Sequence, residues 1–258
     1  SEAFVGGANM APKYDSQQGI YDTCLALIGR GIALLSQPAA VDGMDGNADY
    51  IHGGDVSAWV KTAYALKARL LNQVSKLPSY NASEVLAAVN NAYSSNSDDA
   101  ELDAFEVRNP WAQLARNNAN LVLDVWLSKY FVDATNGTIY GVFDPRLPEI
   151  TFPTDGGTYV GTPNGAGFQG VRNTDHVQCY LDVGKWYSSE TSPLLMLTNA
   201  EIRFTEAEAA LRGGQTQRAY DAYLAGIRAH RDKLGVAAAA IDTYINNHAV
   251  SVGKDNLP

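Results

Sequence analysis

The sequence predicts a mainly α-helical protein, in which tetratricopeptide-like helical hairpins carry a long irregular loop insert and a few short strands. Three observations favour this class. Apolar residues recur at helical spacing near both ends of the chain, residues 133–192 show no such period, and glycine pairs and prolines separate the helical segments. With 258 residues, the chain can bury a core that needs no disulfides.

The helical elements are recognised by apolar stripes that follow polar capping residues. Ser16, Asp55, Ser83 and Thr216 are the N-cap candidates, because their side-chain oxygens can accept the free amides of a first turn. The expected helices are Ser16 to about Leu35, Val56 to about Lys76, Glu84 to Tyr93, Asn118 to Val132, Leu197 to Leu211, Thr216 to Leu234 and about Ala237 to Asn247. Residues 94–99 read as a disordered loop.

The organisation that follows is one domain over residues 1–258, itself a fragment of a longer chain. Its helical scaffold covers about 16–132 and 193–250, and a loop-rich insert at about 133–192, in which we expect two short strands, forms the ligand face. Small residues at Ala219, Ala222 and Gly226 allow the last two long helices to pack closely as an antiparallel hairpin. The chain opens without a methionine, which indicates a processed or excised piece.

Charge and cysteine content exclude several classes of protein. The formal net charge of −9 disfavours nucleic acid as a partner. Charged residues make up only 18 %, and neutral polar residues that suit sugars take their place. Two cysteines exclude a disulfide-built scaffold, and Cys24, on an apolar helix stripe, is expected to be a buried free thiol. No run approaches the ~20 apolar residues that span a bilayer.

No motif predicts catalysis, a metal site or a cofactor. Residues 165–170 match G-x-G-x-x-G, but no strand precedes them and no amphipathic helix follows, so we interpret them as a glycine-dense loop. The four histidines lack metal-ligand spacing. Glu201 and Glu208 share one side of a scaffold helix, and we expect solvated or capping charges rather than a glycosidase pair.

Aromatic residues in the loop-like segments give the best candidate site. Exposed rings stack on the apolar faces of sugars, while neighbouring polar groups bond the hydroxyls. The candidate rings are Trp111, Tyr159, Phe168, Tyr180, Trp186 and Tyr187, and the polar companions are Asn109, Arg172, Asp175, His176 and Gln178.

Five segments in order resemble the SusD-like (SusD/RagB) family. They are residues 50–59 (YIHGGDVSAW) with 65–70 (ALKARL), 144–147 (DPRL), 158–165 (TYVGTPNG), 197–209 (LTNAEIRFTEAEA) and 219–235 (AYDAYLAGIRAHRDKLG). The resemblance extends over nearly all of the chain. It covers the middle and late part of such a protein, and it supplies no binding motif that can be carried over residue by residue.

The resemblance implies a non-catalytic lipoprotein on the surface of the bacterial outer membrane, held by a lipid anchor outside this sequence. Such proteins capture glycans, or occasionally peptides, and deliver them to a SusC-like TonB-dependent transporter. Two other functions stay open: a carbohydrate-active enzyme, and a helical-repeat adaptor that binds other proteins.

Overall fold

The structure, a computed structural model, describes residues 7, 9–11, 13–38, 43–120, 125–167, 169–170 and 176–257. Its elements are α1 (Gln17–Leu35), α2 (Val56–Gln73), α3 (Ala82–Val89), a 3-10 turn η2 (Asn96–Asp98), β1 (Ala100–Leu102), α4 (Pro110–Ala119), α5 (Lys129–Thr135), α6 (Leu147–Ile150), β2 (Leu194–Leu197), α7 (Asn199–Arg212), α8 (Thr216–Lys233), α9 (Ala238–Ile245) and η3 (Lys254–Asn256). The predicted mainly α-helical class is confirmed. None of the described helices has the length and apolarity needed to cross a membrane.

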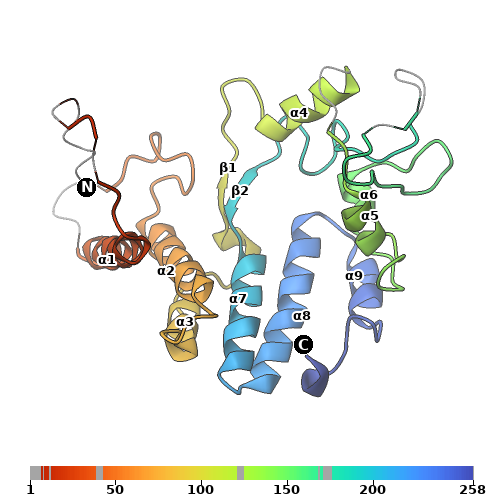
Figure 1. The fold of residues 1–258 in the computed structure, drawn as a ribbon. Helices are drawn as coiled ribbons and strands as arrows, with labels where there is room; N and C mark the ends of the chain where they lie inside the picture. The colour runs from red at the N-terminus through yellow and green to blue at the C-terminus, as the bar shows by residue number, and fades with distance from the viewer. Residues whose placement is uncertain are drawn as a thin grey trace.

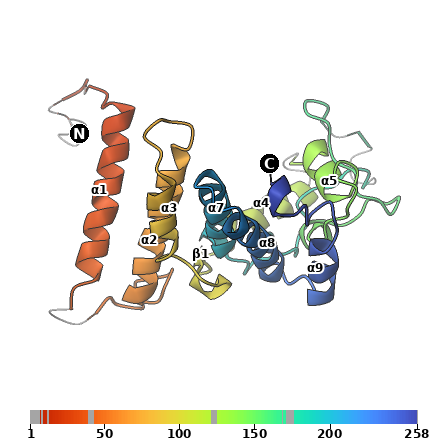
Figure 2. The ribbon, with the colours of Figure 1, turned by 90° about the horizontal axis from the view of Figure 1, so that it is seen from below.

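The helices α1, α2, α7 and α8 form a row with α1 at its outer end, and α3 packs on α2 and α7 (Figures 1 and 2). The short helices α4 to α6 and the long loops gather at one end of this row (Figure 1). We refer to residues 125–192 as the loop-rich end and to α1, α2, α3, α7 and α8 as the helical row.

Local capping explains where most helices begin. Ser16 accepts a hydrogen bond from the amide of Gly19, and Asp55 accepts from the amide of Ser57 at 2.8 Å, as the sequence predicts. The third helix begins earlier than expected, because Asn81 and not Ser83 caps it. Thr216 is the first residue of α8 and does not cap it, since the N-cap is Gln215 and makes no side-chain bond.

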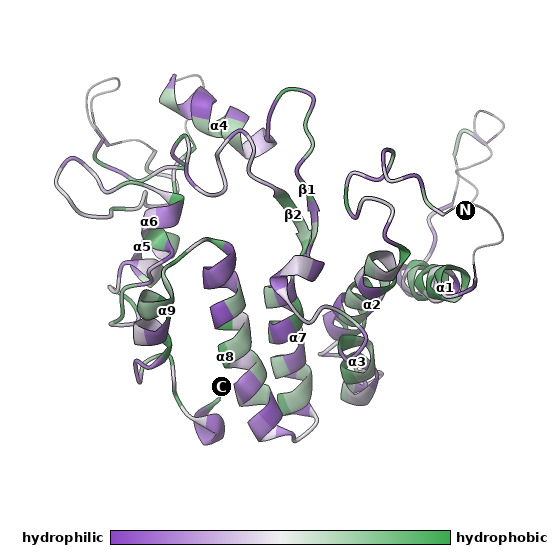
Figure 3. Ribbon diagram, turned by 180° about the vertical axis from the view of Figure 1, so that it is seen from behind, coloured by the Kyte–Doolittle hydropathy of each residue, from purple (hydrophilic) through white to green (hydrophobic). Residues whose placement is uncertain are grey.

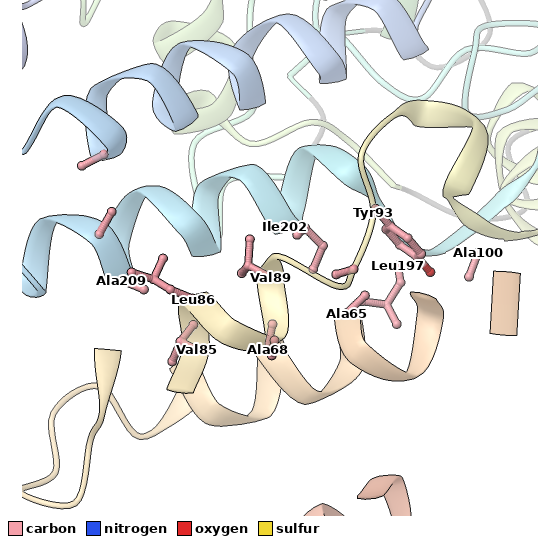
Figure 4. Close-up of a cluster of buried hydrophobic side chains, with 14 residues drawn as sticks. Ala65, Ala68, Val85, Leu86, Val89, Tyr93, Ala100, Leu197, Ile202 and Ala209 are labelled. Atoms are coloured by element: carbon pink, nitrogen blue, oxygen red, sulfur yellow. The ribbon is translucent and has the colours of Figure 1, made fainter. Parts of the chain in front are cut away.

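Small buried residues bring the helices of the row together. Ala65 and Ala68 of α2 are fully buried against α3 and α7, where Ile202 is also fully buried (Figure 4). The α7–α8 hairpin is equally close. A Cβ at Gly226 would lie 3.1 Å from the ring of Phe204, a tight contact, so the glycine lets the two helices approach closely. The close approach predicted for the hairpin is confirmed.

The outermost helix differs from expectation. Hydrophobic residues cover much of α1 (Figure 3), yet none of its residues is buried. Ile20, Leu27 and Leu34, which the helical spacing of apolar residues predicts to face the core, are about half exposed, because among the described elements α2 is the main one that packs on this helix. Cys24 is a half-buried free thiol and not a fully buried one.

The predicted helix over residues 118–132 is wrong. Helix α4 ends at Ala119, and within the described part of this stretch residues 125–128 are extended, with Trp126 bridged to Tyr180 and Ser128 to Thr162. Helix α5 begins only at Lys129. An apolar run predicts burial, but its period cannot separate a short helix from a buried extended segment.

The two strands flank the insert and do not lie inside it. They form an antiparallel pair that joins the helical row to the loop-rich end. Residues 94–99, read as disordered, are held by Asp98, whose carboxylate accepts from the amides of Ser94 and Ser95 and pairs with Lys61.

The segment 50–59, one of the five that carry the family resemblance, is held by hydrogen bonds to Asp49 just before it. The Asp49 carboxylate accepts from the amides of Ile51, His52 and Gly54 and from the indole of Trp59 at 2.7 Å. Gly54 has φ +85°, and a Cβ there would lie 2.7 Å from the Met44 carbonyl oxygen. These residues therefore fix the entry to α2 and are distant in sequence from the candidate site.

Candidate functional site

Three extended segments position the loop-rich end. The amide of Leu127 donates to the Cys179 carbonyl at 3.0 Å, and the amide of Thr162 donates to the Leu127 carbonyl at 2.8 Å. The amide of Cys179 in turn donates to the Val160 carbonyl at 2.7 Å. Residues near 127, 161 and 179 are thereby held side by side, and two hollows open beside them.

The first hollow, which we call the apolar pocket, has a volume of about 410 Å³. It lies between α4, α5, the start of β2 and residues 181–187. Its lining is Trp111, Leu114, Val125, Leu127, Phe131, Thr135, Arg146, Ile150, Leu181, Tyr187, Pro193, Leu194, Leu195 and His230. Ten of these fourteen residues are apolar, and one of them, Trp111, is 46 % exposed. Such a pocket suits a ligand with an apolar face and few polar contacts.

The polar residues of the apolar pocket form one linked group. The Tyr187 hydroxyl lies 2.7 Å from Nε2 of His230, and Nη1 of Arg146 lies 2.5 Å from Nδ1 of the same ring. Asp144, which is 2 % exposed, pairs with both Arg146 and Arg231. The guanidinium of Arg231 also stacks on Tyr244, 3.8 Å from its ring centre.

Burial and charge set the protonation of this group. Burial, together with the positive charges of Arg146 and Arg231, lowers the pKa of His230 to about 4. The imidazole is therefore neutral at pH 7. Burial alone would raise the pKa of Asp144, but its hydrogen bonds and ion pairs with the two arginines outweigh burial and leave the pKa lowered. Burial raises the pKa of the Tyr187 hydroxyl, which keeps its proton.

The second hollow, the polar groove, has a volume of about 470 Å³. It is lined by Lys129, Asp133, Asn136, Thr138, Tyr159, Val160, Gly161, Pro163, Gln169, Val177 and Gln178. Three side-chain amides and one tyrosine face it, which is a set suited to hydroxyl groups. Burial raises the pKa of Tyr159.

The structure divides the predicted site residues between these hollows. Trp111 and Tyr187 line the apolar pocket, while Tyr159 and Gln178 line the polar groove. Phe168, Arg172 and Asp175 lie outside the described residues.

Three half-buried predicted residues line neither hollow. The rings of Tyr180 and His176 are 5.0 Å apart, and Tyr180 also meets Trp126 edge-on at 5.3 Å. Trp186 packs edge-on against Tyr187, with ring centres 4.9 Å apart, and joins the hydrophobic cluster around α8 and α9. Of the three, Trp186 directly supports a lining residue, Tyr187.

Asn109 has a structural role that the sequence analysis missed. It is fully buried, caps α4 through the amide of Trp111 at 2.6 Å, and donates to the Ser192 carbonyl at 2.6 Å. Because its amide is occupied within the protein, we assign Asn109 to positioning Trp111 and not to direct ligand contact.

Other residues of the site were not found from sequence. Arg146 and His230 are 84 positions apart, and only the fold brings them together. The sole signal was the resemblance of residues 144–147 to a family turn. Exposed rings at Tyr130, Tyr140 and Phe143 were also missed, because Tyr130 lies in the segment predicted as a continuous buried helix and the other two were not distinguished from ordinary loop residues.

The carboxylates considered for catalysis lie in the helical row. Glu201 accepts two hydrogen bonds from Arg69 of α2, at 2.5 and 2.6 Å, and Glu208 accepts from Asn72 at 2.8 Å. Both therefore tie α2 to α7. Within the described residues, no three metal-binding side chains come together.

Comparison with known proteins agrees with this architecture. Residues 1–256 match the SusD-like family described as "Starch-binding associating with outer membrane". No curated protein sequence matches the chain.

Solved structures share the fold. A SusD homologue from Bacteroides fragilis matches with a TM-score of 0.78 and 21 % identity, covering 98 % of this chain and 59 % of that one. One from Bacteroides vulgatus matches with a TM-score of 0.77 and 22 % identity, covering 94 % and 49 %.

A chitin-binding SusD homologue from Flavobacterium johnsoniae matches with a TM-score of 0.76 and 23 % identity, covering 94 % and 49 %. The chain thus spans about half the length of the solved structures that it matches. On the match over residues 1–256, the chain belongs to the SusD-like family.

Proposed function

We propose that the chain binds extracellular glycans at its loop-rich end. The observation that carries this proposal is the apolar pocket, where the exposed indole of Trp111 and the Tyr187 hydroxyl stand among apolar walls. A sugar ring can stack its apolar face on the indole while one of its oxygens accepts from the hydroxyl. The family description and the chitin binding of a structural neighbour support the same ligand class.

The polar groove extends the proposed surface. Its amides at Asn136, Gln169 and Gln178 can bond sugar hydroxyls, and Tyr159 offers a ring. The predicted residues beside it, Tyr180 and His176, stay part of the proposed site, as do Phe168, Arg172 and Asp175.

We further propose that binding is not followed by catalysis. Glycoside hydrolysis requires two carboxyl groups facing one another across the sugar. Of the described residues lining the two hollows, Asp133 alone is a carboxylate, and it is paired with Lys129. This arrangement favours a binding protein over the alternative of a carbohydrate-active enzyme.

The remaining parts of the proposal concern the whole protein. Its chain forms one domain in which helices carry the loop-rich ligand face. We place it on the surface of the outer membrane as a lipoprotein, anchored through a part outside this sequence. Bound glycans pass to a SusC-like TonB-dependent transporter. The family description, which pairs starch binding with the outer membrane, supports this placement.

A glycan array followed by calorimetry tests the proposal. Trp111→Ala removes the exposed ring, and we expect affinity for the best glycan to fall roughly 30-fold, because a central aromatic contact is worth about 2 kcal/mol. Tyr50→Ala, which removes an exposed ring in the loop before α2, is the matched control and should bind like the parent.

Trp186→Ala should weaken binding as well, because Trp186 supports Tyr187. The absence of any glycan ligand, or unchanged affinity in both tryptophan variants, would refute the proposed site. Release of shorter sugars during a long incubation would instead favour the enzyme.

A further inference from the structure

The donors and acceptors of Arg146, His230 and Tyr187 determine how their hydrogen bonds run in the apolar pocket. A guanidinium has only donors, so Nδ1 of His230, 2.5 Å from Nη1 of Arg146, must be an unprotonated acceptor. The neutral imidazole therefore carries its proton on Nε2 and donates it to the oxygen of Tyr187 at 2.7 Å.

This tautomer leaves the Tyr187 O–H proton free to point elsewhere. Within the described part of the chain the hydroxyl has no other hydrogen-bond partner than His230, and Tyr187 lines the apolar pocket. Because burial raises the pKa of the hydroxyl, it remains a donor at neutral pH. The pocket thus presents a hydroxyl donor that needs an acceptor from the ligand.

The apolar lining of the pocket restricts which chemical group of the ligand can carry the acceptor oxygen. Side chains such as Leu114, Leu127 and Leu195 offer no partner for sugar hydroxyls, and each unpaired hydroxyl would lose its bonds to water. A carboxylate is also a poor fit. Arg146 already gives Nε and Nη2 to Asp144 and Nη1 to His230, so no bidentate face remains. A small apolar group with one neutral oxygen fits best.

We propose that the apolar pocket binds an acetyl group of the glycan, with the methyl against the leucines and the carbonyl oxygen accepting from the Tyr187 hydroxyl. The inference rests on the proposed glycan binding and narrows it to acylated sugars. His230 is then a positioning residue, which turns the hydroxyl toward the ligand.

The probes that test the inference share one backbone. The 258-residue chain is titrated with the β-1,4 tetramers of N-acetylglucosamine, glucosamine and glucose, which differ only in the substituent at carbon 2. An array that carries acetylated and non-acetylated forms of other backbones extends the comparison. We expect the acetylated tetramer to bind at least tenfold more tightly than the glucose tetramer, and acetylated forms to lead across the array.

Two variants test whether the preference for acetylated glycans arises in the apolar pocket. Tyr187→Phe keeps the ring and removes the donor, so the preference for the acetylated form should fall roughly tenfold, the worth of one hydrogen bond. Its control is Tyr220→Phe, which removes a hydroxyl that bonds Ser251, 2.6 Å away and outside the pocket. Leu114→Phe narrows the pocket and should remove the preference while stacking on Trp111 keeps the glucose tetramer bound. This second variant decides the question even if Tyr187→Phe does not fold.

The possible failures are distinguishable. Equal affinity for acetylated and plain forms, with binding still lost in Trp111→Ala, overturns the acetyl pocket and leaves glycan binding intact. A preference that survives Leu114→Phe also overturns it, as does tighter binding of an acidic glycan such as tetragalacturonate. If no glycan on the array binds, both proposals fail.

Discussion

The helical row and the loop-rich end are stabilised in different ways. In the helical row, the buried side chains are mainly small and apolar, such as Ala65, Ala68 and Ile202. In the loop-rich end, many buried side chains are polar. They are Thr135, Asp144, Thr151, Thr154, Thr162, Gln178, Asp182, Ser188 and Ser192.

The reason lies in the backbone. A helix pairs its own amides and carbonyls, so its side chains are free to be apolar. The loop-rich end lacks long helices, so side chains there form the hydrogen bonds to backbone amides and carbonyls. Asp182 accepts from the amide of Phe152 at 2.8 Å, Thr151 donates to the Tyr180 carbonyl at 2.7 Å, and Ser188 donates to the Asp182 carbonyl. Irregular backbone held in this way can shape a ligand surface, which regular helices do not offer here.

The largest expected effect breaks the ionic group that joins the loop-rich end to α8. Asp144→Ala removes the carboxylate shared by Arg146 and Arg231 and leaves buried guanidinium charge without a partner. We expect the free energy of unfolding to fall by about 4 kcal/mol, measured by urea denaturation. In the helical row, the pair of Glu201 and Arg69 is part-exposed, so Glu201→Ala should cost at most about 1 kcal/mol. Equal losses would contradict the comparison.

A change of pH tests the same group without mutation. The pKa of His230 is lowered to about 4 in the folded protein and is about 6.5 in the unfolded chain. The unfolded state therefore binds more protons between these values, and stability present above pH 6.5 is lost as pH falls toward 4. The expected loss is about 3 kcal/mol.

Urea denaturation at a series of pH values measures this loss. His230→Gln should remove most of the dependence between pH 6.5 and 4, with a remainder from His52, whose pKa burial also lowers, while replacement of the exposed His248 by Gln should leave the dependence in place. Because the pKa of Asp144 is lowered, this carboxylate titrates at more acidic pH, outside the range in which His230 acts. A flat curve for the parent protein would show that His230 is not held neutral.

The smallest effect sharpens the comparison by removing one hydroxyl at constant shape. Thr151→Val leaves the Tyr180 carbonyl and the Asp182 carboxylate with one donor fewer, and we expect a loss of about 2 kcal/mol by urea denaturation. Thr205→Val makes the same change at a buried position of α7, where the helix pairs its own backbone. That variant should stay within about 0.5 kcal/mol of the parent. A reversed order would mean that the loops do not depend on their buried hydroxyls.

The helices could be predicted because their signals are local. Ser16 and Asp55 mark helix starts within three residues of the amides that they cap, and Gly226 marks the close face of α8. The extended stretch around Trp126 could not be predicted, because its pairing partner Tyr180 is 54 positions away. An apolar run by itself does not distinguish a helix from a strand.

In the candidate site, too, local features could be predicted from the sequence and long-range contacts could not. Rings in segments predicted as loops pointed to Trp111 and Tyr187, whose chemistry is carried by residue type alone, although Trp111 lies on α4, a helix that the sequence did not predict. The sequence by itself thus determined the helical class, most helix starts and the kind of side chain available for a ligand, since capping and apolar periodicity act over a few residues. Only the tertiary structure decided which rings line a pocket, that Asn109 is a buried cap, and that Arg146 and His230 orient the Tyr187 hydroxyl. Those contacts join segments up to 84 residues apart, and chain folding, not spacing, sets such distances.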